Sequence, residues 1–257
     1  MPLIEIIPVP LMFVLVAAVM LLSFETGYQF GKRSRTIGDG EAPAMSSMVA
    51  GSLGMLAFVL AFTFSIASSH HDTRRMLVLE EANAIGTAYL RADFLDSESR
   101  EEVKRLLRDY VDLRVQKVTV DNYKTILARS EEIHDQLWAQ VSSAAMTRPD
   151  TNTQLAVESI NNVIDLHGKR AMAALFTRIP VTIWFALIVI PVFCMLTMGV
   201  QIGFAGKRRL IAVVPMLLAF TVLVTLVIDL DRPGSGMIKV SQRAMSDVHQ
   251  RISGEAD

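Results

Sequence analysis

The 257-residue sequence contains one cysteine, Cys194, and almost no net charge. A single cysteine excludes an intrachain disulfide and a metal cage built from cysteines, although it does not identify a compartment. The 25 basic and 26 acidic residues leave a formal net charge of -1. Nucleic acid binding requires a concentrated basic surface, so we expect no nucleic acid partner.

The sequence also lacks a convincing catalytic or metal-binding arrangement. Glu131 and His134 have the three-residue spacing found in di-iron bundles, but such a site requires a second pair and two further carboxylates. Asp165 and His167 are two residues apart and do not supply that pair. We therefore interpret these residues as solvated surface groups, and we expect no enzyme activity, no metal and no cofactor.

Charge is nearly absent from four apolar runs, at about residues 8–24, 46–69, 180–203 and 210–230. Each run approaches the ~20 residues that an α-helix needs to cross a bilayer. Lipid cannot form hydrogen bonds with an exposed backbone, so these runs must be helical. The sequence predicts an all-α membrane protein in which two pairs of transmembrane helices flank an all-helical extramembrane insert, with the lipid bilayer as a partner.

The order of these runs divides the chain into four segments. No proline interrupts residues 46–95, so we expect the second transmembrane helix to continue out of the membrane. Gly27 and Gly31 of the first helix are four apart, a spacing that permits close helix packing. The expected segments are 1–69 (transmembrane helices 1 and 2), 70–178 (the insert), 179–231 (helices 3 and 4) and 232–257 (a short polar tail).

The first helix after the extended one begins near residue 97. Ser97 or Ser99 is expected to cap it, and Glu102 would complete a Ser-x-x-Glu capping box with Ser99.

Three bulky side chains of the second span, Phe58, Phe62 and Ile66, follow one another at intervals of four residues and form a nearly continuous stripe. If several copies of this helix line an axis, these side chains form stacked apolar rings, and such a constriction closes by dewetting. The positive edges of the aromatic rings would attract an anion. Spacing alone favours a simpler interpretation, contact with lipid or with the bundle core, because every transmembrane helix has apolar stripes.

Ionisable residues near the membrane edges form a second candidate site. Two aspartates end the fourth span, on the same side as the charged residues that follow the second span. We predict a charge network between them, and the alternative is an exposed aspartate pair that contributes little. An acidic residue of the first helix is either an interfacial anchor or a partner of another helix. The candidate residues are Glu25, Arg74, Arg75, Glu80, Glu81, Asp229 and Asp231.

Basic residues do not decide the orientation. The two short connections carry six of them, which by the positive-inside rule would make that side cytoplasmic and place the insert outside. Eight basic residues flank the spans on the opposite side. The side of the membrane that carries the insert therefore stays open.

The layout of two spans, a helical insert and two further spans resembles that of the bestrophins, and the stripe looks like their neck. More closely, the chain is similar to a bacterial family of bestrophin-like membrane proteins that is catalogued as a domain of unknown function. The segments that carry this similarity are Glu25–Gly27, Leu60–Ser65, Glu80–Asp93 and Asp229–Pro233.

The resemblance implies a homo-oligomeric ring of five subunits in the cell inner membrane, with the insert on the cytosolic side. That orientation opposes the charge count of the short connections. It also implies a channel for inorganic anions such as chloride, with its gate at Phe58, Phe62 and Ile66. The chain lacks the run of acidic residues that builds a calcium clasp in animal bestrophins, which puts calcium gating in doubt.

A different class of function is also compatible with the sequence. The protein could be a membrane sensor or scaffold whose helical insert binds a ligand or a partner. A monomer or dimer with an external insert would favour the sensor, and a larger ring with an internal insert would favour the channel.

Overall fold

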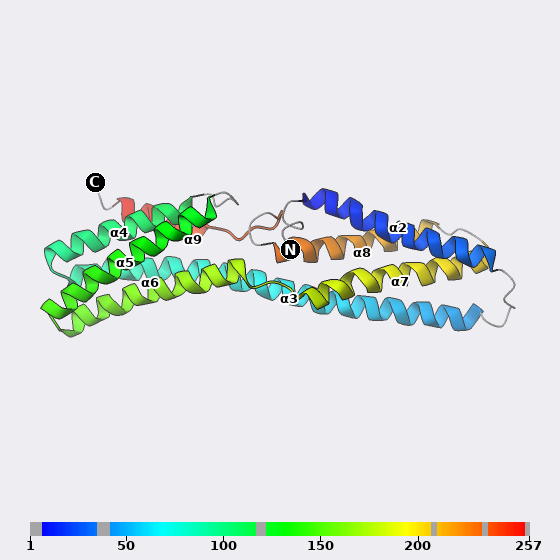
Figure 1. The fold of residues 1–257 in the computed structure, drawn as a ribbon, viewed down its shortest axis with the longest axis horizontal. Coiled ribbons are helices and arrows are strands. Elements are labelled where there is room, and N and C mark those ends of the chain that lie inside the picture. Colours follow the sequence, from blue (N-terminus) through cyan, green and yellow to red (C-terminus); the bar gives the residue numbers. More distant parts are fainter. Residues whose placement is uncertain (1–6, 35–41, 117–121, 207–209, 233–235, 255–257) are drawn as a thin grey trace. The chain divides into compact units, whose positions relative to one another are not determined.

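The computed structural model describes residues 7–34, 42–116, 122–206, 210–232 and 236–254 (Figure 1). All regular secondary structure in these residues is helical, as predicted. The chain divides into two compact units. Unit 1 consists of Met1–His71 and Arg178–Lys239, and unit 2 consists of Asp72–Thr177 and Val240–Asp257.

Unit 1 contains the helices that cross the membrane. Four helices are long and apolar enough to span a bilayer, which confirms the four predicted spans and identifies a multi-pass membrane protein. These helices are α2 (Val9–Arg33), α3 (Ala42–Arg91), α7 (Val181–Ala205) and α8 (Leu210–Asp231).

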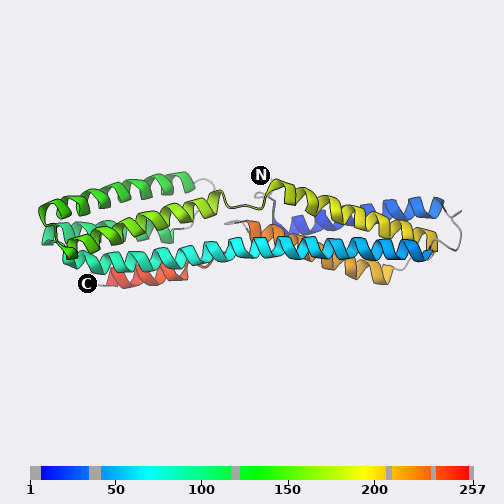
Figure 2. The same ribbon diagram turned by 90° about the horizontal axis from the view of Figure 1, so that it is seen from below.

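Helix α3 belongs to both units. It runs for 50 residues without a break, so the second span does continue beyond its apolar part as the sequence predicts (Figure 2). Within unit 1 its buried residues recur at intervals of three or four, which turns one face of the helix towards the core. These residues are Leu56, Leu60, Thr63 and Ala67.

Helices α2 and α7 approach each other closely at two pairs of glycines. A Cβ atom on any of the four would collide with a backbone carbonyl oxygen of the other helix. The expectation that the glycines of α2 permit close packing is confirmed, and α7 supplies a matching pair at the same spacing. The contacts join Gly27 to Leu196, Gly31 to Val200, Gly199 to Phe24 and Gly203 to Tyr28.

Unit 2 is the predicted all-helical insert. Figures 1 and 2 show its long helices side by side, and its core is formed by their apolar faces. Besides the second part of α3, it contains η1 (Ala92–Phe94), α4 (Ser97–Val115), α5 (Tyr123–Thr147), α6 (Thr151–Leu175) and α9 (Arg243–Ser253).

Aspartates cap two helices of unit 2. The carboxylate of Asp96 accepts hydrogen bonds from the backbone N–H groups of Glu98 and Ser99, at 3.1 and 3.0 Å. The prediction that Ser97 or Ser99 caps α4 was therefore wrong. The cap is Asp96, directly before Ser97, and aspartate caps helices as well as serine does. Asp150 caps α6 in the same way, through the N–H of Thr153 at 2.8 Å.

The C-terminal segment was predicted to be a short polar tail, but it contains a helix with a buried apolar face. It forms α9, whose apolar residues Met245, Val248 and Ile252 are buried in the core of unit 2. Their spacing of three and four places them on one face of the helix. On another face, His249 Nε2 lies 2.8 Å from Asp112 Oδ1 of α4.

The glycine contact between α2 and α7 gives the first prediction. Gly199→Ala should destabilise unit 1 by about 1–3 kcal/mol, because the added methyl group meets rigid backbone and the two helices must separate. The measurement is the thermal unfolding midpoint of the full chain in detergent. Gly51→Ala is the matched control, since a Cβ there has no neighbour within 4 Å. Equal midpoints for the two variants would contradict the role assigned to Gly199.

Candidate functional site

The predicted stripe lies on a face of α3 that unit 1 leaves largely uncovered. The side chains of Phe58 and Phe62 are 71% and 58% exposed, whereas Leu56 and Leu60 of the same helix are buried. Two large aromatic side chains one turn apart are thus available to lipid or to another protein surface.

Ile66 departs from this stripe. It is partly buried and packs against the core of unit 1. The reason is geometric: four residues of an α-helix turn about 40° beyond a full turn, so Ile66 lies about 80° around the axis from Phe58. The exposed face continues instead through Ser65.

Asp229, at the end of α8, binds the chain that follows it. Its carboxylate is buried and accepts hydrogen bonds from the N–H groups of Met237 and Ile238, at 2.7 and 2.9 Å. A Cβ atom at Gly236 would lie 2.5 Å from Asp229 Oδ1, so a larger residue there would displace the Asp229 carboxylate. Asp229 therefore fixes the path of residues 236–238 beside the end of α8.

Asp231 and Arg232 bind two further segments of unit 1. The Asp231 carboxylate accepts a hydrogen bond from Ile179 N at 3.0 Å, and Arg178 donates to the Asp231 carbonyl oxygen at 3.0 Å. Arg232 donates to the carbonyl oxygen of Ile7 at 2.7 Å. The end of α8 thus joins the residues that precede α2 and α7.

The other residues of the predicted charge network have different surroundings. Arg75 and Glu80 are exposed, and Arg74 is buried. Glu25 is half-buried on α2 and accepts a hydrogen bond from Gln29 at 3.1 Å. The network between the end of α8 and the extension of α3 stays a prediction.

Glu81, the last member of that set, lies in a cluster of polar side chains inside unit 2. Every long helix of the unit contributes to this cluster, and each member is mostly or fully buried. We call it the buried polar cluster. Its members are Glu81 of α3, Tyr110 and Arg114 of α4, His134 of α5, and His167 and Arg170 of α6.

The carboxylate of Glu81 is the centre of the cluster, with 0% of its side chain exposed. Tyr110 donates its hydroxyl hydrogen to Oε1 at 2.5 Å, and Arg170 pairs with Oε2. Arg114 Nε lies 3.3 Å from Oε1. Two guanidinium groups and a hydroxyl donor keep the buried carboxylate ionised, because each of them favours its charged form.

The two histidines lie against Tyr110. The ring centroids of His134 and Tyr110 are 4.8 Å apart, and those of the two histidines are 4.7 Å apart. Burial is the main reason that the pKa of each imidazole is lowered to about 4, and the nearby positive charge of Arg114 contributes to this lowering. Both histidines are therefore neutral at pH 7.

The sequence interpretation of His134 and His167 as solvated residues was wrong, since they are only 5% and 6% exposed. A signal was present: His167 follows Val163 by four residues and so shares its buried face. Glu131 is exposed and points elsewhere on α5, so the spacing of a di-iron motif brings no second ligand to His134.

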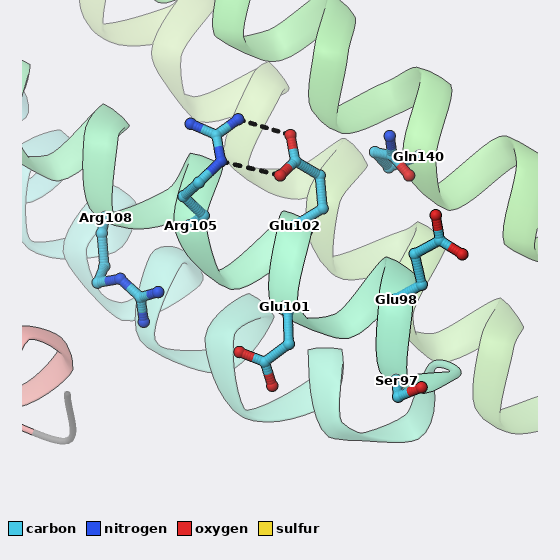
Figure 3. Close-up of a pocket in the computed structure, with 7 residues that line it drawn as sticks. All are labelled: Ser97, Glu98, Glu101, Glu102, Arg105, Arg108 and Gln140. Carbon is cyan, nitrogen blue, oxygen red and sulfur yellow. Dashed lines mark hydrogen bonds and ion pairs between the residues drawn. The ribbon is translucent and has the colours of Figure 1, made fainter.

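A shallow pocket of about 630 Å³ lies between α4 and α5 (Figure 3). Three glutamates line it together with two arginines of the same helix. Arg105, one of these arginines, donates two hydrogen bonds to Glu102, at 2.8 and 2.5 Å, and a third to Asp109 at 2.7 Å. Because Arg105 already binds the carboxylates of Glu102 and Asp109, we assign no ligand to this pocket.

These features define a class: a four-span helical membrane protein whose second span extends into a separate helical unit. The chain belongs to the Bestrophin-like domain family, which matches residues 13–245. This confirms the resemblance seen in the sequence. No match was found among curated proteins or among solved structures.

The hydrogen bonds of Asp229 give a second prediction. Asp229→Asn should destabilise unit 1 by about 1–3 kcal/mol, because the amide NH₂ would face one of two backbone N–H donors and leave it unpaired. Thermal unfolding in detergent measures the loss, and faster proteolysis near residue 237 would locate it. The exposed Glu158 of α6 offers a control, Glu158→Gln. A loss of equal size in both variants would contradict the specific role of Asp229.

The histidines give a third prediction, a loss of stability on acidification. Each pKa falls from 6.5 in the unfolded chain to about 4 in the fold, so the unfolded chain binds more protons between these values. Lowering the pH from 6.5 towards 4 should therefore favour unfolding by about 1.4 kcal/mol per pH unit for each histidine.

Trp138 of α5 reports on unit 2 in a Trp184→Phe background, because the chain has only two tryptophans. Its fluorescence during denaturant unfolding, in gluconate salts, measures this pH dependence. His134→Gln with His167→Gln should flatten it between pH 6.5 and 4.5, whereas the surface variant His249→Gln should not. An unchanged slope in the double variant would refute the assignment.

Proposed function

We propose that this protein is a homo-oligomeric channel for small inorganic anions such as chloride, with an apolar gate on α3. The single observation that carries the proposal is the exposed aromatic pair, Phe58 and Phe62, on a membrane-spanning helix. Membership of the Bestrophin-like domain family supports it.

The physical argument concerns what surrounds those two side chains in an assembly. When copies of α3 surround an axis, Phe58 and Phe62 form two apolar rings one helical turn apart, about 5–6 Å along the axis. A narrow apolar ring expels water and so blocks ions until it widens. The ring edges carry partial positive charge, which favours an anion over a cation. Ile66, which is rotated towards the core, would support the rings from behind.

The rest of the assembly follows from the family resemblance. We propose a ring of five subunits in the cell inner membrane, with unit 2 as a vestibule on the cytosolic side. The charge network of Asp229 and Asp231 with Arg74, Arg75 and Glu80 would stabilise the end of α8 in that ring. The burial of Asp229, Asp231 and Arg74 supports a structural role, because buried ionisable groups in membrane proteins are rarely left without partners.

Chloride flux through liposomes that contain the purified protein is the test of this proposal. Wild-type protein should pass chloride. Phe58→Ala or Phe62→Ala should increase the flux several-fold, because the smaller alanine side chains leave a wider opening that water enters more easily. Phe64→Ala is the matched control: Phe64 is 38% exposed but lies about 200° around the helix from Phe62. Absence of flux from a folded oligomer, or an equal effect of all three variants, would overturn the proposal.

A membrane sensor or scaffold is the second candidate. Unit 2 favours it, because that unit has its own hydrophobic core and a buried polar cluster that no pore requires. The mass of the purified particle distinguishes the two candidates: a monomer or dimer supports the sensor, and a larger ring supports the channel.

A further inference from the structure

The buried polar cluster fixes the position of one hydrogen atom. Glu81 can only accept, and Tyr110 donates its single hydroxyl hydrogen to Glu81 Oε1. The 3.0 Å contact between the Tyr110 oxygen and His167 Nδ1 therefore requires a hydrogen on Nδ1. Neutral His167 then carries a bare lone pair on Nε2, and this buried atom has no partner among the described residues.

His134 presents a second atom of this kind. Its Nε2 is also buried and also lacks a partner within the part of the chain that the structure describes. The two imidazole rings meet edge to face, 4.7 Å between centroids, so the two unpartnered nitrogens lie on adjacent rings of the same cluster. Buried polar atoms nearly always have a partner in folded proteins. Two such atoms in adjacent rings indicate a ligand that joins the site.

The charges around these atoms indicate the sign of that ligand. Glu81 contributes one negative charge, and Arg114 and Arg170 contribute two positive charges, which leaves an excess of one positive charge. Gln242, the N-cap residue of α9, is neutral and accepts a hydrogen bond from Arg170 at 2.7 Å. Asp135 raises the pKa of its neighbour His134 only weakly, and is exposed. A metal dication would increase the excess to three, whereas this excess positive charge attracts an anion.

We propose that the buried polar cluster binds a small monovalent anion such as chloride together with one proton. The proton adds to Nε2 of one histidine and turns an unpartnered acceptor into a donor. The anion accepts hydrogen bonds from that N–H group and from Arg114 Nε, which pairs with Glu81 by charge but has no hydrogen-bond partner of its own. Proton and anion enter together, so the net charge of the cluster does not change.

Chloride-linked proton uptake tests this proposal on the full chain in detergent. Sodium chloride replaces sodium gluconate at constant ionic strength in a weakly buffered solution at pH 5.5, and the pH change gives the protons bound. We expect uptake that approaches one proton per chain. The apparent affinity for chloride should rise by up to about tenfold for each pH unit of acidification between pH 6.5 and 4.5, because the two ligands are linked.

Histidine variants locate the effect. His134→Gln combined with His167→Gln should abolish the linked uptake, and His249→Gln, which removes a surface histidine paired with Asp112, should retain it. Uptake that persists in the double variant, or no uptake by the wild type, overturns the proposal. The wild-type result alone decides the matter if the double variant has lost its helicity.

This site does not depend on the proposed channel, because the cluster lies in unit 2 and the aromatic pair lies in unit 1. Phe62→Ala should alter chloride flux and leave the linked proton uptake unchanged. Protein without flux that still takes up protons with chloride would reject the channel and keep this site.

Discussion

A bilayer offers no hydrogen-bond partner to a peptide backbone, and the structure of unit 1 depends on this constraint. Within the spans the helices satisfy their own backbone, and α2 and α7 approach so closely that a Cβ atom at their glycines would collide with a carbonyl oxygen. At the ends of the spans, charged side chains form hydrogen bonds with the backbone. Asp229, Asp231 and Arg232 bind backbone groups of three segments that lie outside the helices. Residues that look like a charge cluster in the sequence thus form hydrogen bonds with backbone groups at the membrane edge.

Unit 2 is under a different constraint, because water can form hydrogen bonds with its polar groups when the unit unfolds. Its core nevertheless contains a carboxylate with no exposed surface, held by groups from two other helices. Breaking one partner of such a set is costly, since it leaves a buried charge uncompensated. The cluster therefore specifies how α3, α4 and α6 are arranged, while the apolar residues of α9 complete the core around it.

The sequence was sufficient to predict the four spans, the long second helix and the helical insert, because these depend on local hydropathy and on the absence of proline. Contacts between distant segments could not be predicted in the same way. Nothing local pairs Gly199 with Phe24 or determines which side of α3 meets the core. The burial of His134 could not be predicted from its spacing to Glu131 along α5, because this burial depends on contacts with α4 and α6. Helix α9 was missed because its three apolar residues are spread among polar ones.

The geometry of Asp229 limits what the predicted charge network can be. Each of its two carboxylate oxygens already accepts one backbone N–H group. A carboxylate has about four lone-pair sites, so two remain for any cation of the network. A guanidinium group would have to bind from the side that the amides of Met237 and Ile238 leave open. The proposed network must therefore add to the anchoring of residues 236–238 and cannot replace it.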